Sequence, residues 1–269
     1  MAITVASSST AYSASGTSLV IAKPSGLAVG DLMLAQIRND DGNSITLPSG
    51  WSTLTSTFNP FNFVYVHYKY ADSGDVAASN FTWTLPSSVI SAGGILRITG
   101  ASPLIGSAFL AGGQSNTATP SFATGVTPTR PDSLLVQFWF YMGNSNASLG
   151  GYAIVTSNPT WTEAYDVGME SNAGITCAWA VRPQTTSTGA WSATGGTGTS
   201  DYNSFLVSIN EALRIDTSES VTLSETSKQN QSIKKDETIT LTESPLVSMK
   251  KWISMVKSAL STLINEDKS

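Results

Sequence analysis

An ordered set of short apolar segments occurs twice in this chain before the composition changes near residue 213. Residues 30–37 begin with Gly-Asp and continue as an apolar run, and residues 131–138 echo them with Pro-Asp and a similar run. Each copy also carries two tryptophans at similar spacing, at Trp51 and Trp83 in the first copy and at Trp161 and Trp191 in the second. A repeated strand pattern predicts a scaffold of two similar halves, at about 1–105 and 106–212, because a catalytic site usually breaks such a repeat.

The segments before residue 213 show the alternation of β-strands. Residues 63–70 place bulky side chains on both faces, because successive side chains of a strand point to opposite sides, and this predicts a central strand. Residues 32–37 and 134–141 are more continuously apolar, which is typical of strands covered on both sides. Clusters of Asp, Asn, Ser and Gly separate the segments, and no helical period interrupts them. The predicted fold class is all-β, an antiparallel β-sandwich built from an internal duplication.

A boundary lies near residue 213, where the density of charge rises. Residues 1–212 carry 6 basic and 11 acidic side chains, whereas the shorter remainder carries 8 of each. Within residues 213–244, the segment 219–225 recurs as 237–243, and each copy alternates aliphatic and hydroxyl residues like a strand with one apolar face. Two such strands are too few to be stable alone, so we expect a linker that adds to a sheet or a stalk shared with other chains.

The last segment, residues 245–269, is the one clear helical pattern. Ser244 fits the N-cap and Pro245 fits the first helical position. Apolar residues then recur at steps of three and four, and we expect them to serve oligomerisation or anchoring: Leu246, Met249, Ile253, Val256, Leu260 and Leu263. Two interpretations fit: a short coiled coil that joins copies, with a trimer favoured, and an amphipathic helix packed on its own domain, since Trp252 and Ile264 widen the stripe.

Charge and apolar content exclude several partners. The net charge is −5 and no basic cluster occurs in residues 1–212, so nucleic acid is not expected as a partner. The basic side of residues 245–269 is thin, and no run approaches the roughly 20 apolar residues that span a bilayer, so no membrane partner is expected. Cys177 is the single cysteine and cannot form an intrachain disulfide. The first residues lack a secretory signal, so we expect synthesis in the cytoplasm without a signal peptide.

Catalytic and metal-binding patterns are sparse. His67 is the single histidine, and without a neighbouring Cys or Asp cluster it is expected to be a structural residue of a central strand. No Gly-x-Ser-x-Gly motif is present. The turns at 40–43 and 72–75 offer oxygens to calcium, but without the full spacing of a calcium loop. Three neighbouring carboxylates are the nearest to a glycosidase pair and are expected to be solvated: Glu163, Asp166 and Glu170. We therefore expect no enzymatic activity, catalytic residue, cofactor or metal.

Aromatic residues suggest a binding function of a different class. The tryptophans of both copies could stack on sugar rings if they were exposed, but their regular placement favours the core. Three tyrosines are expected in loops and are the better candidates for ligand contacts: Tyr152, Tyr165 and Tyr202. A carbohydrate-binding or receptor-binding adhesion module, with a cell-surface glycan as partner, is therefore the alternative function.

Several motifs, in this order, resemble a β-sandwich module of virion structural proteins in tailed bacteriophages. They are Lys-Pro-Ser-Gly-Leu-Ala-Val-Gly-Asp-Leu-Met-Leu-Ala at 23–35, Pro-Ser-Gly-Trp at 48–51, Tyr-Val-His-Tyr-Lys-Tyr-Ala at 65–71 and Phe-Thr-Trp at 81–83. With the second, degenerate copy, the resemblance covers residues 1 to about 212. The repeat at 219–225 is similar to strand repeats of viral and microbial surface proteins.

This resemblance implies a non-enzymatic structural protein on the surface of a virus particle. The protein would be a capsid decoration or head-fibre component, or part of a short tail fibre. Its implied partners are other virion proteins of the capsid or tail and further copies of itself. The resemblance brings no catalytic residues with it.

Overall fold

Antiparallel β-strands make up nearly all of the regular structure in the part of the chain that the computed structural model describes, which confirms the all-β fold class. Contacts along the chain divide it into two compact units, Met1–Ala212 and Leu213–Ser269. The predicted strand repeat and C-terminal helix lie outside the described residues. These are 2–40, 43–59, 62–102, 108–117, 121–122, 125–142, 150–154, 159–167, 174–194 and 200–212.

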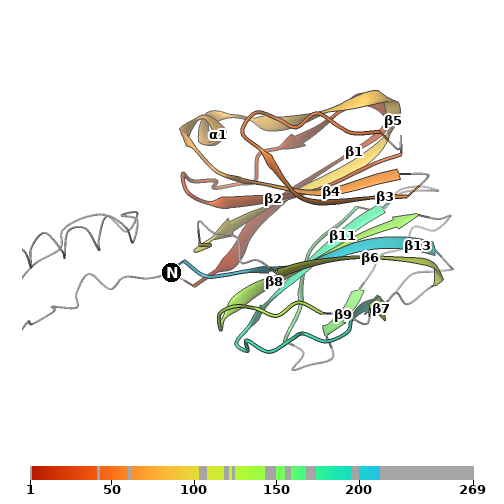
Figure 1. Cartoon of the computed structure of the whole chain (residues 1–269). Helices are drawn as coiled ribbons and strands as arrows, with labels where there is room; N and C mark the ends of the chain where they lie inside the picture. The colour runs from red at the N-terminus through yellow and green to blue at the C-terminus, as the bar shows by residue number, and fades with distance from the viewer. Residues whose placement is uncertain are drawn as a thin grey trace, which may run out of the picture. The chain divides into compact units, whose positions relative to one another are not determined.

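The described residues of the first unit form three sheets and one short helix (Figure 1). The first sheet has the order β1-β5-β2-β4-β3, from β1 (Thr4–Ala22), β5 (Asn80–Thr99), β2 (Leu32–Asn39), β4 (Asn62–Tyr70) and β3 (Ser52–Asn59). The second has the order β10-β11-β8-β13-β6, from β10 (Thr162–Val167), β11 (Gly174–Arg182), β8 (Ser133–Met142), β13 (Ser200–Ile209) and β6 (Ala108–Thr117). The third is small, with the order β7-β12-β9, from β7 (Ser121–Phe122), β12 (Trp191–Thr194) and β9 (Gly150–Ile154). Helix α1 (Ser73–Ala77) follows β4.

The main core lies between the two large sheets, which face each other. It is lined by alternate residues of the central strands, such as Leu32 and Leu34 on β2 and Val136 and Phe138 on β8, all at 0% exposure. Every residue of β2 is buried, and so are the described side chains of β8. The continuous apolar runs therefore mark strands that are covered on both faces, as the sequence predicted.

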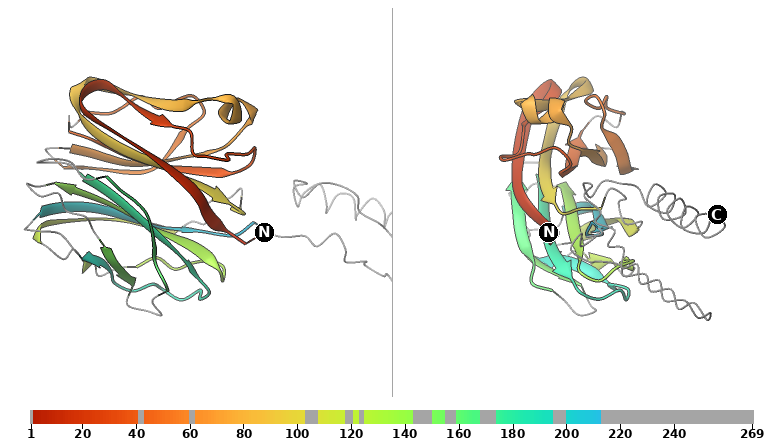
Figure 2. Two further views of the ribbon diagram at one scale, coloured as in Figure 1. Left: turned by 180° about the vertical axis from the view of Figure 1, so that it is seen from behind. Right: turned by 90° about the vertical axis from the view of Figure 1, so that its left-hand side faces the viewer.

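The outer face of each large sheet carries a second core. Strands β1 and β5 are long enough to leave the first sheet and fold back over it, as β1 does in Figure 2. Residues 91–98 of β5 pair with β2, whereas residues 80–89 pair with β1, form one further bridge from Thr84 to Thr46, and make the cover. The small sheet β7-β12-β9 covers the outer face of the second large sheet. The fold is thus a sandwich with an additional outer layer on each side, which the sequence pattern did not reveal.

A buried hydrogen-bond chain joins the two large sheets inside the main core. The Gln36 side-chain amide on β2 donates to the carbonyl oxygen of Trp139 on β8 at 2.7 Å. The Tyr165 hydroxyl on β10 donates to Gln36 Oε1 at 3.0 Å. Burial raises the pKa of Tyr165 well above its usual value, so the hydroxyl stays a donor. The side chains of Gln36 and Tyr165 are thus both hydrogen-bonded within the core. These hydrogen bonds fix how the two sheets are placed against each other.

The sandwich has two distinct ends. At the end that we call the exit end, Ala212 N donates to Gly100 O at 2.7 Å, and β1 begins close by. At the opposite end, the far end, β2 finishes at Asn39 and β8 finishes at Met142. Figure 1 shows both strands running from the exit end to the far end. The chain therefore leaves the first unit from the end opposite to the one at which these central strands finish.

Gly94 on β5 provides a test of how tightly the two sheets pack. A side chain at this position would overlap the Tyr165 ring. We expect Gly94→Ala to lower the free energy of unfolding by about 1–3 kcal/mol, because the well-packed interface cannot expand freely. Urea unfolding followed by tryptophan fluorescence measures this loss. The same change in a Tyr165→Leu background should cost less, and equal costs in both backgrounds would contradict the contact.

Candidate functional site

The three tyrosines expected in loops lie on strands instead. Tyr152 is on β9, Tyr165 on β10 and Tyr202 on β13, and each is at most 8% exposed. The Tyr152 hydroxyl forms a 2.5 Å hydrogen bond with Thr176 Oγ1, and Tyr165 bonds to Gln36. The expectation of solvent-facing loop tyrosines is therefore wrong, because each side chain points from its strand into one of the cores.

The six residues expected to serve oligomerisation or anchoring, Leu246, Met249, Ile253, Val256, Leu260 and Leu263, lie outside the described part of the chain. Glu170, one of the three neighbouring carboxylates, also lies outside it. The helix at 245–269 therefore stays a prediction from the sequence.

Three of the four repeat tryptophans are core residues. Trp51, Trp83 and Trp191 are 7%, 0% and 2% exposed, as expected from their regular placement. Trp51 packs edge-on against Trp83 with ring centroids 5.2 Å apart, and Trp191 packs on Trp139 at 5.0 Å. Trp161 differs, because it is only partly buried at the rim of the outer core of the second sheet.

His67 is buried at 0% exposure on β4, which confirms the expectation of a structural histidine on a central strand. The Trp83 indole N–H donates to His67 Nδ1 at 3.1 Å. His67 therefore accepts at Nδ1 and carries its proton on Nε2. Burial lowers the pKa of His67 from 6.5 to about 4, so the ring is neutral at pH 7. Protonation of Nδ1 would set two donors against each other.

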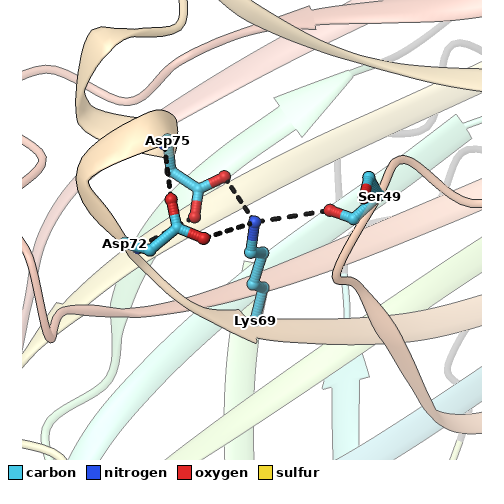
Figure 3. Close-up of polar contacts among 4 residues, drawn as sticks. All are labelled: Ser49, Lys69, Asp72 and Asp75. Atoms are coloured by element: carbon cyan, nitrogen blue, oxygen red, sulfur yellow. Dashed lines mark hydrogen bonds and ion pairs between the residues drawn. The ribbon is translucent and has the colours of Figure 1, made fainter.

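A cluster of charged side chains surrounds Lys69, near the end of β4 (Figure 3). Its ammonium group lies 2.7 Å from Asp75 Oδ1, 3.2 Å from Asp72 Oδ2 and 3.3 Å from the Ser49 carbonyl oxygen. Burial lowers the pKa of Lys69, but the hydrogen bonds and attraction from the two carboxylates outweigh it and leave the pKa raised. Gly50 makes room for this side chain, since a Cβ there would meet Lys69 Cε at 2.9 Å.

The two aspartates of this cluster also cap helix α1. Asp72 accepts from the Asp75 backbone N–H at 3.0 Å, and the Asp75 carboxylate accepts from the Asp72 N–H at 2.9 Å. This reciprocal pair is a capping box. The backbone hydrogen bond from Asp75, followed by the bond from Lys69, lowers the pKa of Asp72. The Asp-rich turn at 72–75 therefore binds the chain's own ammonium group and joins the 48–51 turn, β4 and α1.

A second group of polar side chains lies on the outer face of β10. Glu163 pairs with Ala178 and Asp166 with Thr176 across the β10–β11 ladder. Burial, followed by repulsion from Asp166, raises the pKa of Glu163. Two carboxylates thus share one face of an edge strand beside Trp161. Glu163 is exposed on this face, whereas Trp161 and Asp166 are partly buried.

Other kinds of site are not formed by the described part of the chain. Among those residues, no three His, Cys, Asp or Glu side chains gather as they would around a metal ion. No helix within the same ranges has the length and apolar character needed to cross a membrane. Cys177 is buried in the main core beside Tyr165, and burial raises its pKa well above the usual value. A protonated thiol in that position is a packing residue.

Comparison with known proteins gives no family for this chain: no family model, no curated protein and no solved structure matches it. Its function is therefore argued from the geometry of the first unit and from the sequence patterns.

Replacing Lys69 tests the structural role of the charged cluster. In Lys69→Met, the carboxylate of Asp75, which is 7% exposed, loses its cation. We expect a loss of about 2–4 kcal/mol in the free energy of unfolding, because a buried charge without its partner is costly. Asp72→Asn is the matched control and should cost clearly less, since the Asp72 side chain is 62% exposed and Asn also caps helices. Equal losses in urea unfolding would contradict this assignment.

The histidine predicts a dependence of stability on pH. Its pKa is about 4 when folded and 6.5 when free, so the unfolded chain binds a proton first as the pH falls. Stability should therefore decrease from pH 6.5 downward and lose about 3 kcal/mol from this residue by pH 4 and below. His67→Gln, which keeps an acceptor for Trp83, should remove that part of the pH dependence. The free energy of unfolding is measured at pH 7 and pH 4 for the unmodified chain and for His67→Gln. An equal difference between the two pH values in both proteins would show that His67 is not buried in its neutral form.

Proposed function

We propose that this chain is a non-enzymatic structural protein displayed on a virus particle of the tailed-phage type. The observation that carries the proposal is the polarity of the first unit. The chain continues beyond Ala212 from the exit end, and the strands β2 and β8 finish at the far end. A module joined to its particle through the segment after Ala212 would present its far end outward. The sequence resemblance to phage virion modules agrees with such a display.

The use of the interior side chains supports a scaffold role. His67, the Lys69 cluster, Cys177 and the buried tyrosines are all taken up by packing or by internal hydrogen bonds. Catalysis would instead require a nucleophile or base directed toward a substrate. These groups stabilise strands and turns, which suits a protein that must survive outside the cell.

We also infer that the two halves derive from one duplicated unit. Read from β1 and from β6, the large sheets have the same strand order, β1-β5-β2-β4-β3 and β6-β13-β8-β11-β10. A bulge falls between Thr53 and Thr55 on β3, and a matching one falls between Glu163 and Tyr165 on β10. Bulges are specific local features, so their agreement supports a common origin.

The strand pairing shows which residue of the second half corresponds to each residue of the first. Leu32 pairs with Tyr70 and Ile98, and Leu134 pairs with Val181 and Ile209 in the same way. The sequence comparison matched residues 30–37 with residues 131–138. The strand pairing instead matches residues 30–37 with residues 132–139, one position later. Gly30 and Asp132, which then correspond, both have positive φ angles of 89° and 55°. The backbones of the two large sheets should superpose most closely when Leu32 is matched with Leu134. A closer superposition with Leu32 matched to another residue would contradict the duplication.

Two placements on the particle remain within the proposal. A capsid decoration or head fibre would occur in many copies, held by a small interface. A short tail fibre would be a trimer joined through residues 213–269.

Analysis of purified particles tests the proposed function. We expect the chain to be present in virions banded on a density gradient, in fixed stoichiometry with other structural proteins by mass spectrometry. Light scattering of the full chain should give the mass of an oligomer, with a trimer favoured. A version of the chain that ends at Ala212 should be a folded monomer. Absence of the chain from purified virions would overturn the proposal, whereas two monomers would overturn only self-association through the tail.

A further inference from the structure

We propose that the outer face of β10 is a binding subsite for a neutral sugar ring, with Trp161 as the stacking surface and Glu163 and Asp166 as hydrogen-bond acceptors. This inference does not depend on where the protein sits on a particle. It assigns an adhesive function to the outer face of an edge strand on which Glu163 is exposed and Trp161 is partly exposed.

The strand register places these side chains together. Trp161 packs at the rim of the outer core, so its ring is on the outer side of the sheet. Glu163 lies opposite Ala178, and cross-strand partners share a face, so its carboxylate is on the same side. The bulge between Glu163 and Tyr165 then shifts the alternation by one residue. As a result Tyr165 points inward and Asp166 again faces outward.

The surface beneath the carboxylates is rigid. Thr176, the cross-strand partner of Asp166, donates its hydroxyl hydrogen to the Tyr165 carbonyl oxygen at 3.2 Å and accepts a 2.5 Å hydrogen bond from the Tyr152 hydroxyl. The Tyr152 ring lies 6.5 Å from the Trp161 ring, between centroids. A platform whose supporting residues are fixed in this way loses little conformational entropy when it binds a ligand.

Comparison with the first half shows that this face has a distinct composition. At the corresponding positions, Trp51 is buried, and Thr53 and Ser56 replace Glu163 and Asp166. The cross-strand partners there are His67 and Tyr65, where the second half has Ala178 and Thr176. A cover made only of short strands leaves Trp161 partly exposed in the second half, whereas the folded-back parts of β1 and β5 enclose Trp51 in the first. Two acidic residues and a partly exposed tryptophan thus occur on only one of two otherwise similar faces.

The chemistry of this face fits a sugar. The C–H face of a pyranose stacks on an indole ring, and carboxylates accept hydrogen bonds from neighbouring hydroxyls. Two nearby carboxylates repel sugars that carry an acid, so neutral hexoses or N-acetylhexosamines are favoured over uronic or sialic acids. A single stacking residue gives a weak site, with a dissociation constant of roughly 1 mM. Many displayed copies would raise the overall avidity without any new contact.

Binding of defined glycans to the full chain tests this inference. The probes are hexasaccharides of β-1,4-linked glucose, β-1,4-linked N-acetylglucosamine and α-1,4-linked glucose, a printed array of bacterial surface polysaccharides, and polygalacturonate fragments as an acidic comparison. Binding is measured by titration calorimetry and by the change in tryptophan fluorescence. We expect at least one neutral glycan to bind and the acidic fragments not to bind.

Variants of the face assign the binding to named residues. Trp161→Ala should weaken binding at least about tenfold, while Trp161→Phe should keep part of it, because aromatic anchors carry much of the energy of such contacts. Glu163→Gln and Asp166→Asn should each weaken it by a smaller factor. Thr53→Ala, at the position that matches Glu163 in the first half, is the control and should bind like the unmodified chain. Thermal unfolding of each variant checks that the fold is kept.

Three outcomes would overturn the proposal. The first is that no probe binds at concentrations of about 10 mM, well above the expected dissociation constant. The second is that binding survives Trp161→Ala unchanged, which would place it elsewhere on the chain. The third is that binding requires calcium and depends on the carboxylates but not on Trp161, which would make this face a cation site. None of these results bears on the presence of the chain in virus particles.

Discussion

The mutual burial of the inner faces of two five-stranded sheets is the constraint on which the rest of this structure depends. Each fully buried aliphatic or aromatic side chain contributes about 1.5–3 kcal/mol. The interface needs closely matched shapes as well as apolar content, because Tyr165 enters the space above Gly94, a residue without a side chain. Gln36 then satisfies both a carbonyl oxygen and a hydroxyl within the core. Such a network favours one placement of the sheets over others that would leave polar atoms unpaired.

The outer layers follow from that central packing. Because the outward side chains of β2 and β8, such as Met33 and Leu135, are also apolar, each half buries them under a cover. The first half uses the extended ends of β1 and β5, which enclose an aromatic cluster containing Trp51, Trp83 and His67. The second half uses three short strands and leaves Trp161 at the rim. This difference in cover leaves Trp51 buried in the first half and Trp161 only partly buried in the second.

Side-chain roles at the exit end show how charge is used in a chain with few charged residues. Lys69 joins a turn, a strand and a helix through three oxygens, and Arg97 forms a 2.6 Å ion pair with Asp31. Gly26 and Gly50, which adopt positive φ angles, make room for these two cations. Each pair fixes a loop next to a strand end, where the backbone ladder no longer does so.

The sequence allowed some of these features to be predicted because they depend on local alternation. Continuous apolar runs identified β2 and β8, and bulky residues on both faces identified β4 as a central strand. The regular tryptophans were predicted to be core residues, and three of them are. The prediction that the tyrosines lie in loops was wrong. Tyr202 lies on β13, whose outer face is covered, and Tyr152 lies on β9, which is part of that cover. The residues near each tyrosine do not indicate this cover, because it is formed by segments that are distant in the sequence.

Sequence by itself determined the all-β class, the change of character near residue 213 and the central strands, because period-two alternation and charge density are properties of short segments. Tertiary structure alone decided which faces are closed. Exposure of Trp161 and burial of Trp51 follow from the lengths of strands that pair across the chain. The grouping of Glu163 and Asp166 on one face follows from a bulge that displaces the alternation by one residue. Long-range pairing and register, which no short segment encodes, therefore set which faces of the sheets are closed and which side chains share the outer face of β10.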